Sequence, residues 1–380
     1  MKILFTGGGT GGHFYPIIAV AEEVNEQSET SKILDLKLYY VADSPYDKRA
    51  LYENNLIYEE VSAGKRRAYK SAKNFTDMIK TAIGVFQALL KLFFLYPDVI
   101  FSKGGYAAFP TLVAARILRI PVFMHESDSV PGRVSLWTSK FASRIALSYG
   151  GAAEFFAKDV QKKIAWTGQP VRKEIEQKAT EGAFEFFKLD PTIPTLFVTG
   201  GSLGAEAINN VILEALPELL NSYQIIHQCG PNNIDDTKGR ADIIAGKHPN
   251  FARYQAFGTL NAIEVKNAAG AASLIISRAG SAIFEIALWE VPSIIVPGTA
   301  AVFHGDHQRM NAFAYARTGA CVVIEEENLR PTILMQELAR ILGDSAKKEA
   351  MIAGARTFAK KDASAVIAKE LLAIALSHEK

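Results

Sequence analysis

A histidine closes a glycine-rich turn near the start of the chain, and proton-transfer chemistry is first expected there. A short apolar run leads into Gly7–His13, in which only Thr10 interrupts the glycines. Glycines let a chain leave a strand tightly and bring backbone N–H groups close to a ligand. We therefore expect Thr10, Gly11 and Gly12 to contact a substrate, and His13 to accept a proton from a hydroxyl or to bind a phosphate. A hydrogen bond at a helix start is the alternative for His13.

A second polar cluster, His125–Asp128, directly follows another apolar run. Packing does not explain its four polar residues, because burying charge is costly. Asp128 or Glu126 is therefore a candidate general base, or a partner that orients His13. A structural network at the end of a strand is the alternative. The segment Ser102–Tyr106, with two glycines, is a similar strand-end turn.

The glycine signature returns about half a chain later, where Thr199–Ala205 reads Thr-Gly-Gly-Ser-Leu-Gly-Ala after an apolar run. Two such turns indicate two nucleotide-fold halves facing each other across a cleft, and hence an enzyme that joins two substrates. Arg172 lies at the expected crossing between the halves, where a guanidinium would neutralise a diphosphate. An ordinary surface arginine is the alternative.

Further polar residues in the second half suit a nucleotide sugar. The segment Ser277–Ser281, which includes Arg278, follows an apolar run, and its small residues suit phosphate or uracil contacts. Glu285, one turn into the next helical stretch, suits a ribose diol. Gln308 and Asn311 lie three positions apart on one helix face, where they are able to read sugar hydroxyls.

No metal site or bound cofactor is expected. His304 and His307 have no further ligand cluster, and the chain contains no Asp-x-Asp motif. The charge of a departing diphosphate would then be balanced by helix N-termini and a basic residue.

An NAD-dependent oxidoreductase is the alternative from another class. Gly7, Gly9 and Gly12 fit G-x-G-x-x-G, and Asp43 follows the second predicted strand. Asp43 nevertheless lies about 30 residues beyond the turn, rather than the usual 20 or so.

Apolar runs alternate with helix-period segments along the chain, which predicts an α/β protein with parallel sheets covered by helices on both faces. We expect two Rossmann-like, doubly wound domains, 1–165 and 166–362, with the stretch 363–380 packing back on the first. The predicted strands are 2–6, 37–41, 57–61, 99–102, 122–125, 144–147, 195–199, 224–228, 251–255, 274–277, 293–296 and 321–324.

Composition narrows the class of protein further. The 380 residues carry 42 basic and 40 acidic side chains, a net charge of +2, so nucleic acid is not an expected partner. Two cysteines are too few for a secreted disulfide framework, and a reducing cytosol fits best. We expect no signal peptide, and the apolar stretch 83–95, broken by Gln87 and Lys91, is shorter than the roughly 20 residues that span a bilayer.

Taken in order, these blocks resemble the MurG family (glycosyltransferase family 28), the UDP-N-acetylglucosamine:undecaprenyl-diphospho-muramoylpeptide N-acetylglucosaminyltransferases that make lipid II. The resemblance covers nearly the whole chain. It rests on six ordered motifs: Gly8-Gly9-Thr10-Gly11-Gly12-His13, Gly104-Gly105-Tyr106, His125-Glu126, Gly168-Gln169-Pro170-Val171-Arg172, Gly200-Gly201-Ser202-Leu203-Gly204-Ala205, and Ser277-Arg278-Ala279-Gly280 through His307-Gln308 and Asn311.

The resemblance implies a metal-independent GT-B enzyme that transfers N-acetylglucosamine with inversion from UDP-N-acetylglucosamine to a lipid-linked acceptor. It places the acceptor and the membrane on the N-terminal domain and the UDP-sugar on the C-terminal domain. The implied substrate contacts are Ser202 and Arg172 for the diphosphate, Gly204 in the same turn, Arg278 and Ser281 in the nucleotide pocket, Glu285 for the ribose and Gln308 for the sugar. His13 would lie near the acceptor hydroxyl.

The resemblance also implies peripheral binding to the cytoplasmic side of the cell membrane. The family's membrane patch falls on the apolar stretch 83–95 and on the basic residues that precede it: Lys65, Arg66, Arg67, Lys70 and Lys73.

Four departures from the family pattern affect the acceptor more than the donor nucleotide. Leu203 replaces a glutamine, Asp128 replaces an asparagine, Ser135 replaces another asparagine, and Ser102 replaces a glycine. A different lipid-linked acceptor, or a lipid-binding relative that has lost turnover, therefore remains as an alternative.

Overall fold

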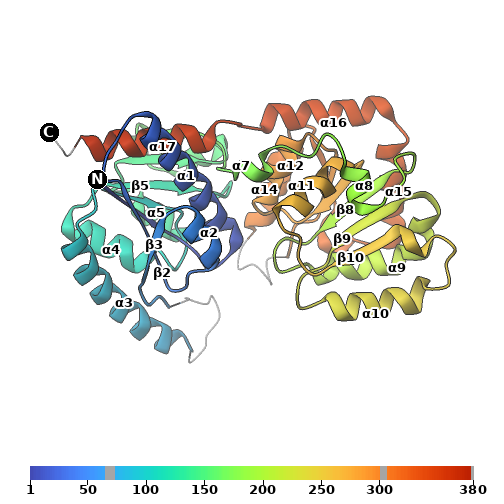
Figure 1. Cartoon of the computed structure of the whole chain (residues 1–380), viewed down its shortest axis with the longest axis horizontal. Coiled ribbons are helices and arrows are strands. Elements are labelled where there is room, and N and C mark those ends of the chain that lie inside the picture. The colour runs from blue at the N-terminus through green and yellow to red at the C-terminus, as the bar shows by residue number, and fades with distance from the viewer. Residues whose placement is uncertain (65–72, 300–305, 378–380) are drawn as a thin grey trace. The chain divides into compact units, whose positions relative to one another are not determined.

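The computed structural model describes residues 1–64, 73–299 and 306–377, and it divides into two compact units. The N-terminal unit comprises Met1–Arg172 and Lys360–Lys380, and the C-terminal unit comprises Lys173–Ala359 (Figure 1). The division therefore falls after Arg172 rather than after residue 165, so Arg172 and the Gly-Gln-Pro segment before it belong to the N-terminal unit.

The N-terminal unit is built on one parallel sheet of seven strands, in the order β3-β2-β1-β4-β5-β6-β7. Strand β1, next to the middle strand β4, carries the apolar run Ile3–Phe5 because helices cover both faces of the sheet. Ile3 and Phe5 point to one face, towards α1 and α17, while Leu4 points to the other, towards α3 and α4. The strands are β1 (Lys2–Thr6), β2 (Lys37–Ala42), β3 (Leu56–Glu60), β4 (Val99–Ser102), β5 (Val122–Glu126), β6 (Arg144–Leu147) and β7 (Ile164–Trp166).

The last helix of the chain completes this unit. Ile367 and Leu371 of α17 are fully buried in the same apolar cluster as Ile3 and Phe5 of β1, and α17 packs along α1. The helices of the unit are α1 (Gly11–Thr30), α2 (Lys48–Glu53), α3 (Lys73–Leu95), α4 (Phe109–Leu118), α5 (Arg133–Thr138), the 3-10 turn η1 (Gly150–Phe155), α6 (Lys158–Gln161) and α17 (Ala363–Leu376).

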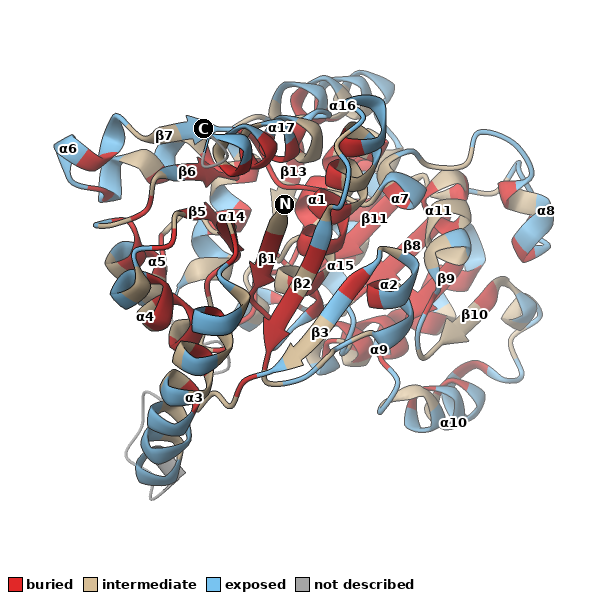
Figure 2. Ribbon diagram, turned by 60° about the vertical axis from the view of Figure 1, so that its left-hand side comes forward, coloured by how far each residue is buried: buried red, intermediate tan, exposed pale blue. Residues whose placement is uncertain are grey.

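The C-terminal unit repeats the design with six parallel strands in the order β10-β9-β8-β11-β12-β13. Strands β1 and β8, each third in the order of its sheet, are both buried, apart from half-buried Lys2 (Figure 2). The strands of this unit are β8 (Thr195–Thr199), β9 (Gln224–Gln228), β10 (Tyr254–Phe257), β11 (Leu274–Ser277), β12 (Ser293–Ile295) and β13 (Cys321–Val323).

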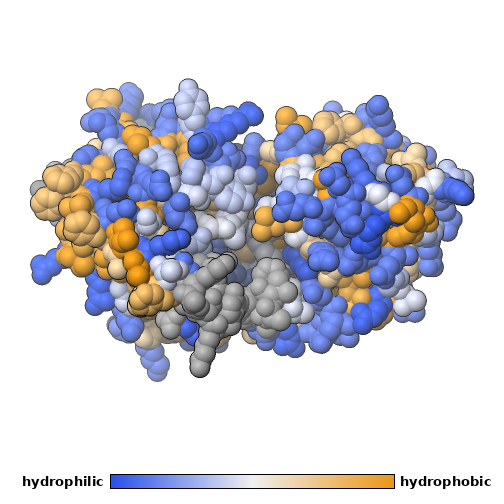
Figure 3. All heavy atoms as spheres, turned by 90° about the horizontal axis from the view of Figure 1, so that it is seen from below, coloured by the Kyte–Doolittle hydropathy of each residue, from blue (hydrophilic) through white to orange (hydrophobic). Residues whose placement is uncertain are grey.

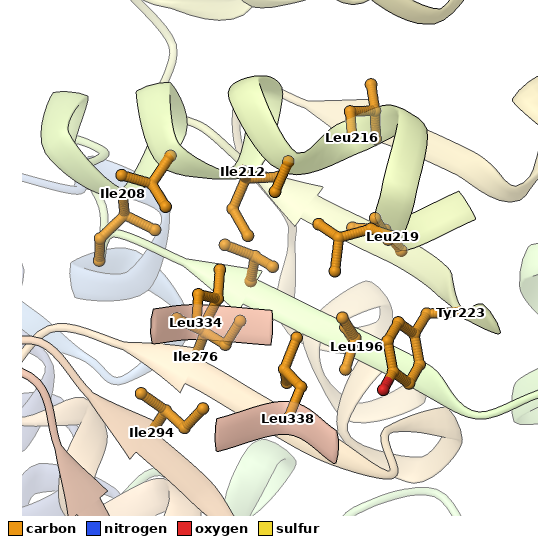
Figure 4. Close-up of a cluster of buried hydrophobic side chains, with 14 of the residues drawn as sticks. Leu196, Ile208, Ile212, Leu216, Leu219, Tyr223, Ile276, Ile294, Leu334 and Leu338 are labelled. Carbon is orange, nitrogen blue, oxygen red and sulfur yellow. The ribbon is translucent and has the colours of Figure 1, made fainter. Parts of the chain in front are cut away.

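One helical stripe supplies much of the C-terminal core. Ile208, Ile212, Leu216 and Leu219 recur at three- and four-residue spacing on α9 and lie over Leu196 of β8 (Figure 4). The helices are α7 (Lys173–Glu176), α8 (Ala183–Phe187), α9 (Glu206–Ser222), α10 (Ile234–Ala245), the turn η2 (Phe251–Arg253), α11 (Ala262–Ala271), α12 (Ala282–Trp289), α14 (His307–Ala316), the turn η3 (Glu326–Asn328), α15 (Pro331–Leu342) and α16 (Ser345–Phe358).

The sequence analysis placed the apolar stretch at residues 83–95, too short to span a bilayer, and this predicted length was wrong. The helical segment Phe75–Leu95 is long and apolar enough, by length and composition, to cross a membrane, and only 17% of its apolar window is buried. Its exposed apolar side chains form a stripe along the helix: Phe75, Met78, Ile79, Ile83, Phe86, Leu90, Phe93 and Phe94. Apolar side chains gather at the left of the view in Figure 3, the side on which α3 lies in Figure 1.

Candidate functional site

Each sheet has a point where the strand order reverses, between β1 and β4 in one unit and between β8 and β11 in the other. In open parallel sheets, ligands bind outside the carboxyl ends of the strands at such a point. The predicted site residues lie at or after the carboxyl ends of β1, β5, β7, β8, β11 and β12. The structure therefore presents two candidate half-sites, one in each unit.

Tyrosine side chains surround the glycine turn after β1. The Tyr40 hydroxyl donates to the Gly7 carbonyl oxygen at 2.7 Å. Gly9 has φ +88°, and a Cβ there would lie 2.8 Å from the ring of Tyr106, so this position requires glycine. A Cβ on Gly11 would lie 2.9 Å from the hydroxyl oxygen of Tyr46. The turn therefore needs glycines, and its backbone leads directly into the start of α1.

His13 lies in the first turn of α1, and its ring is held by Thr10. Thr10 Oγ1 lies 3.1 Å from His13 Nδ1, and this side chain does not cap the helix. The pKa of His13 is lowered by burial and by the charge of Lys103, while the charge of Asp128 acts in the opposite direction. A neutral His13 that donates from Nδ1 to Thr10 keeps a lone pair on Nε2, as a proton acceptor requires.

Glu126 and Asp128 occupy different environments within their cluster. Glu126 is buried, and its two carboxylate oxygens accept the backbone N–H groups of Asp128 at 3.0 Å and Gly132 at 3.1 Å. Burial and the charge of Asp128 raise the pKa of Glu126. Asp128 is half-buried and acts electrostatically on His13. Glu126 therefore shapes the loop, whereas Asp128 is the carboxylate that influences His13.

Lys103 connects several strand ends and received no role in the sequence-based prediction. It follows β4 and is 2% exposed. Its Nζ donates to His125 Nδ1 at 2.5 Å, to Ser127 Oγ at 2.6 Å and to Gln169 Oε1 at 3.2 Å. A lysine directly after a buried strand was the available sequence signal, because such a residue needs polar partners.

Arg172 stacks on the ring of Tyr15, with 4.0 Å between its guanidinium carbon and the ring centroid. The Tyr15 hydroxyl in turn donates to Asp47 at 3.4 Å. Asp43, the candidate ribose ligand of an NAD site, is hydrogen-bonded to the side chain of Tyr106. Arg172 thus lies beside α1, and the Asp43 carboxylate has a partner within the protein.

Backbone groups lie close around the glycine turn after β8, and side chains bond to it. Gly204 has φ +78°, and a Cβ there would lie 2.0 Å from the carbonyl oxygen of Cys229. Gly201 donates its N–H to Thr199 Oγ1 at 3.2 Å, and its carbonyl accepts from Gln228 Nε2 at 3.1 Å. Ser202 is exposed at the tip of this turn, just before α9.

The Arg278 side chain makes its contacts within the C-terminal unit. Its guanidinium donates to the Val296 carbonyl at 3.2 Å and pairs with Glu326 at 2.5 Å, with only 12% of the side chain exposed. Ser281 precedes α12 without capping it, and Glu285 lies in the first turn of that helix. These contacts hold the loop after β11 in place and leave Ser281 and Glu285 half-buried at its edge.

Gln308 and Asn311 both lie on α14 but differ in how far their side chains are buried. Gln308 is half-buried, and its Oε1 accepts the Gly298 N–H at 2.8 Å. Asn311 is 2% exposed and donates from Nδ2 to the Ala279 carbonyl at 3.3 Å. Asn311 therefore supports the loop after β11 from beneath.

Helices α1, α9 and α12 each follow a glycine-containing loop, and among the described residues no side chain caps any of these three helices. Uncapped N–H groups at a helix start are suited to binding an anion. No group of three or more potential metal ligands occurs within the described ranges. His304, Lys65, Arg66, Arg67 and Lys70 lie outside the described residues, and no side-chain description covers Lys73.

Comparisons with known proteins give consistent results for both units. Residues 3–147 match the glycosyltransferase family 28 N-terminal domain, and residues 195–367 match the glycosyltransferase family 28 C-terminal domain. A protein of Shouchella clausii is 36% identical over 342 residues, which cover 90% of each chain. It is named UDP-N-acetylglucosamine–N-acetylmuramyl-(pentapeptide) pyrophosphoryl-undecaprenol N-acetylglucosamine transferase. A Treponema denticola protein of the same name is 32% identical and covers 99% of this chain and 96% of its own length.

Solved structures share the fold. The crystal structure of Acinetobacter baumannii MurG aligns with a TM-score of 0.72 and 24% identity, over 98% of this chain and 99% of that one. The UDP-GlcNAc 2-epimerase of Neisseria meningitidis, solved with UDP-GlcNAc bound, aligns with a TM-score of 0.67 and 14% identity, over 98% of both chains. The expected GT-B arrangement of two Rossmann-like domains is thereby confirmed as the fold class.

Proposed function

The chain belongs to glycosyltransferase family 28, and on this premise we propose that it transfers N-acetylglucosamine from UDP-N-acetylglucosamine to an undecaprenyl-diphospho-muramyl-pentapeptide. The observation that carries the proposal is the similarity, over 90% of both chains, to a transferase of that name. The product is the lipid-linked disaccharide used in peptidoglycan synthesis, and the reaction inverts the anomeric centre.

The reaction is a single displacement. The acceptor hydroxyl oxygen forms a bond to the anomeric carbon, and the bond from that carbon to UDP breaks, so the electron pair leaves with the diphosphate. His13 Nε2 takes the hydroxyl proton, and Asp128 stabilises the imidazolium that forms. Supporting this role, His13 is held at Nδ1 by Thr10 and lies beside the backbone of Gly11 and Gly12.

The donor is assigned to the C-terminal half-site. The N–H groups at the starts of α9 and α12, with Ser202, Gly204 and Ser281, face the diphosphate and nucleotide. Glu285 accepts from the ribose hydroxyls, and Gln308 contacts the sugar. Arg278 and Asn311 position the loop after β11 through the contacts described above, and Arg172 neutralises the leaving diphosphate.

The test is transfer of labelled sugar by the purified protein. UDP-N-acetylglucosamine labelled in the sugar is mixed with vesicles that contain the lipid-linked muramyl-pentapeptide, and label in the lipid fraction is compared with UDP released. We expect one UDP per sugar transferred. A second set of vesicles carries the lipid diphosphate without the muramyl-peptide. Transfer to the second set alone would favour a different acceptor, and donor binding without any transfer would contradict the proposal.

We also propose that α3 binds peripherally to the cytoplasmic face of the cell membrane, where a lipid-linked acceptor resides. The exposed apolar stripe of α3 supports this contact. The opposite side of the helix supports a surface position rather than a spanning one, because Ala88 and Leu92 are fully buried and Gln87 accepts the backbone N–H of Ser62 at 2.9 Å. A helix inserted across the bilayer would lose these contacts.

Binding to vesicles tests this second proposal. Phe86→Glu places a charge in the stripe, where the side chain is 63% exposed, and we expect weaker co-sedimentation with vesicles. Ile243→Glu on α10, 86% exposed in the other unit, is the matched control. Equal binding by the two variants and the unchanged protein would contradict a role for α3.

A further inference from the structure

An ion pair joins the loop after β11 to the turn η3, which has no role in the proposed function. Arg278 Nη2 lies 2.5 Å from Glu326 Oε2, and the two side chains are only 12% and 19% exposed. Removing one partner of such a pair leaves the other charge inside the protein without compensation, which is costly. Glu326 is therefore expected to hold the loop after β11 more strongly than an exposed carboxylate would.

Arg278 connects two segments of the C-terminal unit at once. Its Nη1 donates to the carbonyl oxygen of Val296, just after β12, at 3.2 Å, while Nη2 faces Glu326. A planar guanidinium held at two of its nitrogens has a fixed orientation. The positive charge of Arg278 is thus balanced by a carboxylate of the protein itself.

Two further contacts connect the loops after β11 and β12 to α14. Asn311 Nδ2 donates to the Ala279 carbonyl at 3.3 Å, and Gln308 Oε1 accepts the Gly298 N–H at 2.8 Å. The loop after β11 leads into α12, which carries Glu285 in its first turn. These contacts therefore fix the spacing between the elements that the proposed function assigns to the ribose and to the sugar.

We propose that Glu326 is a positioning residue for the donor, because by holding Arg278 it keeps the loop after β11 in the conformation that binds UDP. Arg278 then acts through the loop, and neutralising the diphosphate is left to Arg172. The inference rests on the proposed function for the identity of the donor. In the alternative scheme, Arg278 leaves Glu326 and binds the diphosphate itself.

Binding of UDP alone separates the two schemes, and calorimetric titration measures it without an acceptor. Glu326→Gln leaves the Arg278 guanidinium without its counter-ion, so the loop shifts and UDP binding weakens by about 10-fold. If Arg278 bound the diphosphate itself, the same substitution would release the guanidinium, and UDP binding would be unchanged or tighter. That result overturns the proposal.

Glu325→Gln is the matched control, because the neighbouring residue undergoes the same change in a more exposed pair. Glu325 Oε1 lies 2.5 Å from Arg309 Nε, and the arginine side chain is 49% exposed. Exposed ion pairs contribute little, so UDP binding is expected to stay within about twofold of the unchanged protein. Equal weakening by Glu325→Gln and Glu326→Gln would overturn the specific role of Glu326.

A double variant tests whether Arg278 and Glu326 act as a pair. Arg278→Gln alone leaves the Glu326 carboxylate without its counter-ion, and it is also expected to weaken UDP binding. Neutral side chains often replace a buried ion pair with little loss. The variant with both substitutions should therefore bind UDP more tightly than either single variant. Losses that simply add in the double variant would contradict the pairing.

Steady-state kinetics separates positioning from loss of folded protein. In Glu326→Gln, KM for UDP-N-acetylglucosamine rises by the same factor as the UDP dissociation constant, while kcat and KM for the acceptor change little. A smaller folded fraction would lower the apparent kcat and leave both KM values unchanged.

Glu326→Asp keeps the charge but shortens the side chain, and it replaces Glu326→Gln should the latter fail to fold. We expect weaker UDP binding, and binding equal to that of the unchanged protein would overturn the proposal. An unchanged protein that binds UDP but transfers no sugar would contradict the proposed function alone, because UDP binding still reports the role of Glu326.

Discussion

The two half-sites share a topology but differ in the chemistry at their strand ends. The N-terminal half-site gathers titratable groups, His13, Lys103, His125, Glu126 and Asp128, whose charges act on one another. In the C-terminal half-site the turn after β8 is held by backbone and neutral side chains, and the loop after β11 is held by the Arg278–Glu326 ion pair. The same topology therefore carries different residue types in the two units, which agrees with the proposed division between proton transfer and nucleotide binding.

The C-terminal half-site shows how neutral groups fix a loop. Asn209 and Asn233 both donate to the Cys229 carbonyl at 2.9 Å, the same carbonyl that lies against Gly204. His227 is fully buried, with its two ring nitrogens 2.8 Å from the Tyr254 hydroxyl and 3.0 Å from Asn209 Oδ1. Because burial lowers the pKa of His227 to about 3, this histidine stays neutral near neutral pH.

His13→Ala is expected to remove proton transfer from the N-terminal half-site. Loss of a general base lowers kcat by about 10²–10⁴-fold, while binding of UDP-N-acetylglucosamine is unchanged because the donor half-site is intact. Stopped assays of sugar transfer and calorimetric titration with the donor measure the two effects. His248→Ala, in the other unit, is the control, and equal turnover in both variants would exclude His13 as the base.

Gly204→Ala is expected to damage the C-terminal half-site through its backbone. The positive φ and the 2.0 Å approach to the Cys229 carbonyl leave no room for a methyl group. We expect a loss of about 3 kcal/mol in the free energy of unfolding, together with weaker donor binding. Gly280→Ala meets nothing within 4 Å and is the matched control in chemical denaturation. Equal stability of the two variants would show that the turn relaxes.

Glu285→Gln sharpens the assignment of the donor. A charge-assisted hydrogen bond to ribose contributes about 1.5–3 kcal/mol, so KM for the donor rises by roughly 10- to 100-fold while kcat changes little. Glu290→Gln, just beyond the other end of α12, serves as the comparison. An unchanged KM in Glu285→Gln would remove this residue from the nucleotide pocket.

His227 gives the smallest expected effect and concerns stability. Burial lowers its pKa from 6.5 to about 3, so the unfolded chain takes up a proton that the folded unit excludes. This contribution to stability is present above pH 6.5 and decreases as the pH falls towards 3, with about 2 kcal/mol lost at pH 5. Urea unfolding at pH 8 and pH 5 measures it. His227→Gln should show a smaller loss on acidification than the unchanged protein, and an equal loss would contradict the assignment.

Most strands were predictable because buried parallel strands are short apolar runs between turn residues. β1, β4, β6, β8, β9 and β11 have the predicted bounds. β10 begins at Tyr254 rather than at residue 251, because Phe251–Arg253 forms a 3-10 turn. β7 was missed, since a three-residue edge strand with an exposed Trp166 has no apolar periodicity.

The site was predictable as a set of motifs but not as a network. The motifs led to His13 and Asp128 as candidate site residues, and these remain predictions. Lys103 and Gln169 lie far apart in the chain, and only folding brings their side chains within hydrogen-bond distance. The burial of a side chain could not be predicted from the sequence either. Gln308 and Asn311 lie three positions apart on one helix, but only the structure shows that Asn311 is buried.

The return of α17 to the first unit has a consequence for synthesis on the ribosome. Ile367 and Leu371 pack in one cluster with Ile3 and Phe5, and they are translated after the whole second unit, Lys173–Ala359. The first unit therefore exposes apolar surface until the entire second unit has been made. Deletion of α17 should consequently produce an aggregation-prone nascent chain, even though every motif residue is still encoded.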